Sequence, residues 1–154
     1  MRKLALCLLI GVSSANAATL DIAVSQGSHE PVTYQYQLSD QRQTLDLRDA
    51  NRYTVAVQDK ARKKDICREA EYRTGMVMTL RQVEKPADGQ YKVEVVGQVS
   101  TLKALEEKGR LDCGVNVLPV IDNAAFSDTS IIEVGKPKVM VVDGKTTVLM
   151  TVKE

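Results

Sequence analysis

A hairpin signal near the end of the chain constrains the fold more than any other feature of the sequence. Residues 136–153 contain two β-rich runs joined by Asp143-Gly144, and Asp-Gly between such runs is typical of a type I′ turn. A two-residue turn would set Val142 opposite Lys145. Alternation along the strands then places five apolar residues on one face: Val139, Val141, Val148, Met150 and Val152. A lone hairpin is only marginally stable in water, so this face requires a second layer.

The first 17 residues have the composition of a signal peptide. Residues 2–3 are basic, and residues 4–12 form an apolar run shorter than the roughly 20 residues that a spanning helix needs. Small residues at the ends of the segment 15–17 fit a cleavage site. We therefore expect an exported chain with one domain over residues 18–154 and no integral membrane segment. A short membrane anchor that stays attached is the alternative.

Composition limits the partners of the exported chain. Removal of residues 1–17 leaves 137 residues, with 19 basic and 20 acidic side chains. Proteins that bind nucleic acid need a basic excess or a strongly basic face. We therefore expect no nucleic-acid partner.

Two cysteines remain after the signal peptide is removed, Cys67 and Cys113. An even pair in an exported chain is expected to form a disulfide. Neither lies in the Cys-x-x-Cys motif that is typical of a redox-active pair. With the single His29 they also lack the ligand spacing of a zinc site. The sequence therefore predicts one structural disulfide, no metal and no cofactor.

Short runs with alternating apolar residues account for most of the remaining chain. They cover residues 19–24, 32–38, 44–48, 52–58, 75–84, 90–100, 115–121 and 129–134. Pro119 cannot donate to a hydrogen-bonded ladder, so its run is expected at a sheet edge. This pattern favours an all-β, mainly antiparallel fold, either a small β-sandwich or an open barrel.

Three segments interrupt the predicted strands. Residues 100–109 begin with hydroxyl residues, contain two leucines three positions apart and end in glycine, which predicts one short helix. Residues 59–73 carry many charges of both signs and favour a solvated loop or short helix held by Cys67. A basic patch for lipid headgroups or glycans is the alternative there. Residues 122–128 predict a loop around Phe126.

The sequence contains no recognisable catalytic motif. It has no Gly-x-Ser-x-Gly nucleophile elbow, no His-Glu-x-x-His motif and no phosphate-binding glycine loop. His29, next to Glu30, is the one acid–base candidate, and it lies in a loop context. We therefore predict a non-enzymatic protein. A small enzyme that uses His29 and nearby carboxylates is an alternative.

Because no catalytic motif is present, we expect the chain to bind a partner, and a sheet edge is the expected binding surface. Added strands gain main-chain hydrogen bonds, and exported β proteins of this size commonly offer such edges. The candidate edge residues are Thr147, Leu149 and Thr151 in the C-terminal strand, and Val115 and Val117 in the strand that contains Pro119. Lysines in the C-terminal hairpin would equally serve to guard an edge against aggregation.

We therefore expect a periplasmic or secreted accessory protein that binds an envelope protein of a bacterial-type cell. A subunit of a pilus, secretion or conjugation apparatus would have this size and compartment. A secreted inhibitor of a hydrolase is the alternative binding function, with the loop around Phe126 or the loop over residues 84–90 as its inserted segment.

Overall fold

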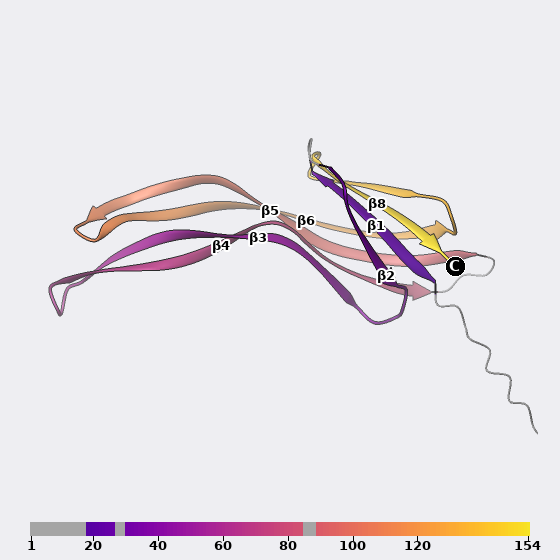
Figure 1. Ribbon diagram of the computed structural model, residues 1–154, viewed down its shortest axis with the longest axis horizontal. Coiled ribbons are helices and arrows are strands. Elements are labelled where there is room, and N and C mark those ends of the chain that lie inside the picture. The colour runs from indigo at the N-terminus through magenta and orange to yellow at the C-terminus, as the bar shows by residue number, and fades with distance from the viewer. Residues whose placement is uncertain (1–17, 27–29, 85–88) are drawn as a thin grey trace, which may run out of the picture.

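The structure, a computed structural model, describes residues 18–26, 30–84 and 89–154, and its regular elements are all β-strands (Figure 1). The predicted signal peptide and His29 lie outside the described residues. The strands are β1 (Thr19–Gln26), β2 (Val32–Gln37), β3 (Gln43–Asp59), β4 (Lys64–Glu84), β5 (Gln90–Leu111), β6 (Gly114–Glu133), β7 (Lys138–Val142) and β8 (Thr146–Lys153). Among the described residues no helix is long and apolar enough to cross a membrane.

The strands form two antiparallel sheets that pack face to face. Sheet A has the order β2-β1-β8-β7, and sheet B has the order β3-β4-β5-β6. Alternate residues of both sheets point inward and form one apolar core. The fully buried side chains are Leu20, Ile22, Met76, Met78, Leu80, Val93, Val95, Ile132, Val148, Met150 and Val152. The predicted all-β, sandwich-like fold is confirmed.

Sheet B is much longer than sheet A and divides in two beyond it. β4 and β5 pair from Glu84 opposite Lys92 as far as Gly75 opposite Ser100, and no further. The β3–β4 hairpin then continues as a first arm, residues 50–74, and the β5–β6 hairpin as a second arm, residues 101–123. Both arms project past sheet A in Figure 1, and the contiguous core cluster of the sandwich contains no residue of either arm, although Ala56 in the first arm is itself buried.

Gly75 marks the point where the first arm leaves the sandwich. Its φ of +116° is strained for residues with a side chain, and a Cβ at this position would lie 2.4 Å from the carbonyl oxygen of Leu47. The bend between sandwich and arm therefore requires glycine.

The two arms are joined again near their tips. Cys67 and Cys113 form a disulfide with Cα atoms 5.9 Å apart, which confirms the predicted pairing; the sequence left open whether the bond lies within or between chains, and here it lies within the chain. Beside it, the backbone N–H of Ala56 in β3 donates to Oδ1 of Asn116 in β6, at 3.2 Å. The arms are therefore held to each other by a covalent bond and side-chain contacts, without a backbone ladder between them.

The helix predicted over residues 100–109 is wrong, because β5 runs through this segment. Lys103 is an extra residue in β5, at a register shift between Leu102 and Ala104. This bulge lets Leu102 and Leu105 pair with β6 residues only two positions apart, so both leucines lie on one face. The three-residue spacing of Leu102 and Leu105 is typical of a helix, but here it results from the bulge. Pairing with β6 outweighs the local preference of this segment for a helix.

Two predicted loops are also strands. The segment 59–73 is a turn over residues 60–63 followed by the start of β4, and residues 122–128 lie inside β6. In the arms both faces of a strand can meet solvent, so charged residues occupy either face without breaking the strand. Clusters of charge and small polar residues therefore gave a false signal for loops.

The C-terminal hairpin forms, but with a register one residue away from the prediction. Val142 pairs with Thr146, which leaves Lys145 as an additional turn residue. The side chain of Asp143 causes this, because its Oδ1 accepts hydrogen bonds from the backbone N–H groups of Lys145, at 3.1 Å, and Thr146, at 2.9 Å.

The change of register exchanges the faces of β7. A one-residue shift moves every side chain of a strand to the opposite face. Met140 and Val142 therefore face the core, whereas Val139 and Val141 are 53% and 64% exposed. The predicted burial of Val139 and Val141 is wrong, and that of the three β8 residues is confirmed.

Phe126 packs against sheet B where the chain has a glycine opposite it. Gly97 pairs with Phe126, and a Cβ on Gly97 would lie 2.4 Å from Cζ of the ring and 2.6 Å from the carbonyl oxygen of Val77. Phe126 contributes to the border of the core from a strand, so no loop is available there for insertion into a hydrolase.

Replacement of Gly97 by alanine is expected to lower the free energy of unfolding by about 1–3 kcal/mol, because ring and backbone must both shift. Alanine at the neighbouring exposed Val96 should change it by less than about 0.5 kcal/mol. Urea unfolding of the two variants measures the difference. Equal stabilities would contradict the close packing of Phe126 on Gly97.

Loss of the disulfide is expected to affect the arms before the sandwich. Chain-entropy arguments give up to about 4 kcal/mol for a crosslink over 46 residues. Serine at both Cys67 and Cys113 should therefore lower the unfolding free energy and raise amide hydrogen exchange in residues 50–74 and 101–123. Exchange in β1 and β8 should rise less, and a uniform increase in all strands would contradict separate stabilisation of the arms.

Candidate functional site

The C-terminal residues predicted at an edge lie in a central strand. β8 is paired on one side with β1 along its whole length and on the other side with β7. Thr147, Leu149 and Thr151 are therefore not edge residues, and that part of the prediction is wrong. The N-terminal strand pairs with a strand more than a hundred residues away, which no local signal in the sequence reveals.

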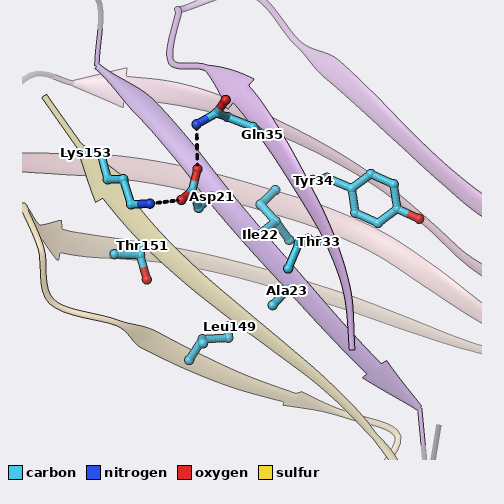
Figure 2. A pocket seen from close by; sticks show the side chains of 9 residues that line it. All are labelled: Asp21, Ile22, Ala23, Thr33, Tyr34, Gln35, Leu149, Thr151 and Lys153. Atoms are coloured by element: carbon cyan, nitrogen blue, oxygen red, sulfur yellow. Dashed lines mark hydrogen bonds and ion pairs between the residues drawn. The ribbon is translucent and has the colours of Figure 1, made fainter. Parts of the chain in front are cut away.

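These three residues belong instead to the outer face of sheet A. A shallow hollow of about 430 Å³ lies on this face, and Figure 2 shows the side chains of the residues that line it. It is lined by Asp21, Ile22, Ala23, Thr33, Tyr34, Gln35, Leu149, Thr151 and Lys153. One row of paired residues crosses all four strands, from Val139 through Leu149 and Ala23 to Thr33.

The charges at this hollow neutralise each other. Asp21 accepts a hydrogen bond from Nε2 of Gln35 at 3.0 Å and forms an ion pair with Lys153 at 2.5 Å (Figure 2). The Lys153 ammonium, followed by the Gln35 amide, holds the pKa of the Asp21 carboxyl below its ordinary value. The hollow therefore offers a flat contact surface rather than a reactive group.

Val115 and Val117 lie in an edge strand, as predicted, but their edge is not free. β6 is the last strand of sheet B, which confirms the edge position of the Pro119 strand. At this end, however, Asn116 accepts a hydrogen bond from the backbone of Ala56, so β3 lies beside β6. An added strand would have to displace this contact.

The side chains of Val115 and Val117 belong to an apolar face of the second arm. Pairing and alternation place six apolar residues on this face: Leu102, Leu105, Val115, Val117, Pro119 and Ile121. Glu107 and Arg110, opposite Val117 and Val115, lie on the same face toward the tip of the arm. Leu105 is 51% exposed. The sequence reasoning missed the two leucines because their spacing indicated a helix. The adjacent alternation over residues 115–121 was the only local signal for this face.

The first arm also has one apolar face. Tyr53, Val55 and Val57 alternate along β3, opposite Ala70, Arg68 and Ile66 of β4. A hollow of about 530 Å³ on this face is lined by Val55, Val57, Asp59, Ile66, Arg68, Glu69 and Ala70. The rings of Tyr53 and Tyr72 extend the face, with centroids 5.9 Å apart.

Both apolar faces point away from the junction between the arms. The junction uses the other phase of each strand: Ala56 in β3 and Asn116 in β6 form its hydrogen bond, and Gly114 lies against Cys67. Because successive side chains alternate between faces, the residues next to these point outward. The arms therefore expose apolar surface that no other part of the described chain covers.

A cleft opens between the edges of the two sheets, beside β2 and β3. It encloses about 540 Å³ and is lined by Val24, Gln26, Glu30, Val32, Tyr34, Asp46, Leu47, Arg48 and Asp49. Asp46 is paired with Arg48, whose Nε and Nη2 donate to its two oxygens at 2.7 and 2.6 Å. This guanidinium lowers the pKa of Asp46 from its ordinary 3.8 to about 2.

The described residues contain no group of three or more His, Cys, Asp or Glu side chains placed to hold a metal ion. The alternative of a small enzyme that uses His29 is untested, because that residue lies outside the described part of the chain. Comparison with protein-family models, with curated proteins and with solved structures finds no match to this chain.

The Asp46–Arg48 pair is expected to contribute to stability above pH 4 and to lose that contribution as the pH falls toward 2. The folded-state pKa is depressed, so acid protonates the unfolded state first and favours it. Asn at position 46 removes the titrating carboxyl. Between pH 4 and pH 2 the Asp46→Asn variant should therefore lose less stability than the wild-type protein. Parallel urea-unfolding curves of the two proteins would contradict the pairing.

Proposed function

We propose that this chain is an exported, non-enzymatic accessory protein that binds another protein of the cell envelope through its two arms. The observation that carries the proposal is the apolar surface of the arms, which project beyond sheet A and have no second layer in the described chain. A pilus, secretion or conjugation apparatus is the kind of assembly in which such a subunit would act.

Exposure of large side chains on the arms supports the proposal. Val57 and Leu105 are 55% and 51% exposed, on arm segments that supply no residue to the core cluster of the sandwich. Contiguous exposed apolar surface on a soluble protein commonly marks an interaction site. Charged residues surround this apolar surface, as in the basic turn of residues 60–64. A typical interface likewise has a polar rim around its apolar centre.

The disulfide between the arm tips also supports a binding role. A covalent link between the arms restricts their motion before a partner arrives, so less conformational entropy is lost on binding. Disulfides of this kind form and persist in oxidising compartments, which agrees with export. A crosslink far from the core is better explained by the need for a rigid projection than by stability of the sandwich.

Glutamate at Leu105 is expected to abolish binding of the partner without unfolding the protein, because it places a charge in the centre of the second arm's apolar face. Tagged wild-type protein should recover one partner at constant stoichiometry from an envelope extract, and Leu105→Glu should recover about tenfold less. Val141→Glu, a matched exposed position on sheet A, should recover the wild-type amount.

Circular dichroism and thermal unfolding of both variants establish that they are folded. Equal recovery by wild type and Leu105→Glu would overturn the arms as the docking surface. A monomer that recovers no partner and turns over a substrate would overturn the binding function altogether.

A further inference from the structure

The free edge of β2 differs from the other edges of the two sheets. β2 has the sequence Val-Thr-Tyr-Gln-Tyr-Gln, and of the four edge strands in the described sheets it alone has no charged residue and no proline. β7 begins with Lys138, β3 carries Asp46 and Arg48, and β6 contains Pro119. Natural sheets protect free edges with such residues, so an unprotected edge indicates a strand that is meant to be paired.

The backbone of β2 is available for pairing along most of its length. Its ladder to β1 uses one side of the strand, from Val24 opposite Val32 to Thr19 opposite Gln37. On the other side, the one hydrogen bond among the described residues is from Nε2 of Gln43 to the carbonyl oxygen of Gln37, at 2.7 Å. The Leu38 N–H donates to the Ala18 carbonyl, which fixes the phase of this ladder, so Thr33, Gln35 and Gln37 direct their backbone groups away from β1.

The cleft between the sheets lies directly beside this edge. Its walls include inward-facing residues of sheet A, Val32 and Tyr34, and Leu47 of sheet B. Val32 is 53% exposed although its partner Val24 is 4% exposed, so the core is incomplete at this edge. A strand added to β2 would direct every second side chain into the cleft and cover these residues.

The charge of the cleft defines which strand would fit. Glu30, Asp46 and Asp49 line it against a single cation, Arg48, which is already paired with Asp46. Neither Glu30 nor Asp49 forms an ion pair with another described residue. An incoming lysine or arginine at this end would meet two carboxylates that have no partner cation.

We propose that β2 accepts an extended segment of a partner protein, which adds a fifth strand to sheet A. The side chains of the segment that point into the cleft are apolar at alternate positions, where they cover Val32 and Tyr34. One further side chain on this same face of the segment is basic and lies near Glu30 and Asp49. This site does not depend on the arms, because none of its residues lies in residues 50–74 or 101–123.

Synthetic peptides test the proposal directly. The probes are two peptides, Thr-Lys-Thr-Val-Thr-Val-Thr and its reverse sequence, each with blocked ends and a fluorescent label. Both are needed because the added strand can run in either direction. Controls replace lysine by glutamate, or methylate alternate backbone nitrogens. Fluorescence anisotropy measures the affinity of each peptide for the full exported chain.

At least one lysine peptide should bind about tenfold more tightly than its glutamate counterpart, with an affinity that falls as salt rises. Methylation of the peptide nitrogens whose N–H groups would donate to β2 should abolish binding, because it removes the hydrogen bonds of the added strand. Val32→Lys should weaken binding about tenfold, whereas Val139→Lys, a valine of equal exposure on the opposite edge strand of sheet A, should leave it unchanged. Leu105→Glu should also leave it unchanged, which separates this site from the arms.

Equal affinities of lysine and glutamate peptides, an equal loss in Val32→Lys and Val139→Lys, or no saturable binding of any peptide would overturn the proposal. Light scattering at the concentrations used tests a second copy as the occupant. A wild-type dimer that Val32→Lys converts into a monomer would assign the edge to self-association, and this too would overturn binding of a partner segment.

Discussion

The pairing of the two ends of the chain, β1 with β8, is the contact on which the remaining structure depends. The ladder runs from Thr19 opposite Lys153 to Gln26 opposite Thr146 and forms the centre of sheet A. Its inward side chains form the centre of one layer of the core, and full burial of each valine, leucine, isoleucine or methionine is worth roughly 1.5–3 kcal/mol. Without this ladder, β2 and the β7–β8 hairpin have no common sheet, and the inner face of sheet B has no cover.

The sequence predicts what depends on neighbouring residues and misses what depends on distant ones. The antiparallel pairing of the neighbouring runs β4 and β5, and the burial of Met76, Met78 and Leu80, were predictable, because sequence neighbourhood and alternation are local. The insertion of β8 between β1 and β7 was not, since no local pattern records a partner at the other end of the chain. The arms could not be predicted for the same reason, because no local pattern shows that sheet A does not extend over residues 50–74 and 101–123.

Two errors have a common origin in irregular strand geometry. An extra residue in β5, Lys103, and an extra residue in the C-terminal turn, Lys145, each shift a register by one position. The first hid the apolar face of the second arm behind an apparent helix, and the second exchanged the buried and exposed valines of β7. Bulges of this kind can be recognised only when the partner strand is known, so the candidate surfaces emerge from the structure and only in part from the sequence.

The position of β1 has a consequence for how the molecule is made. A ribosome or export channel releases the N-terminal strand first, yet β1 obtains its main partner only when the last strand of the chain has followed. During this interval the apolar residues Leu20, Ile22 and Val24 have only the uncharged β2 beside them. The formation of sheet A therefore waits for the last of its strands, and the apolar face of β1 is open to wrong pairing until β8 has been made.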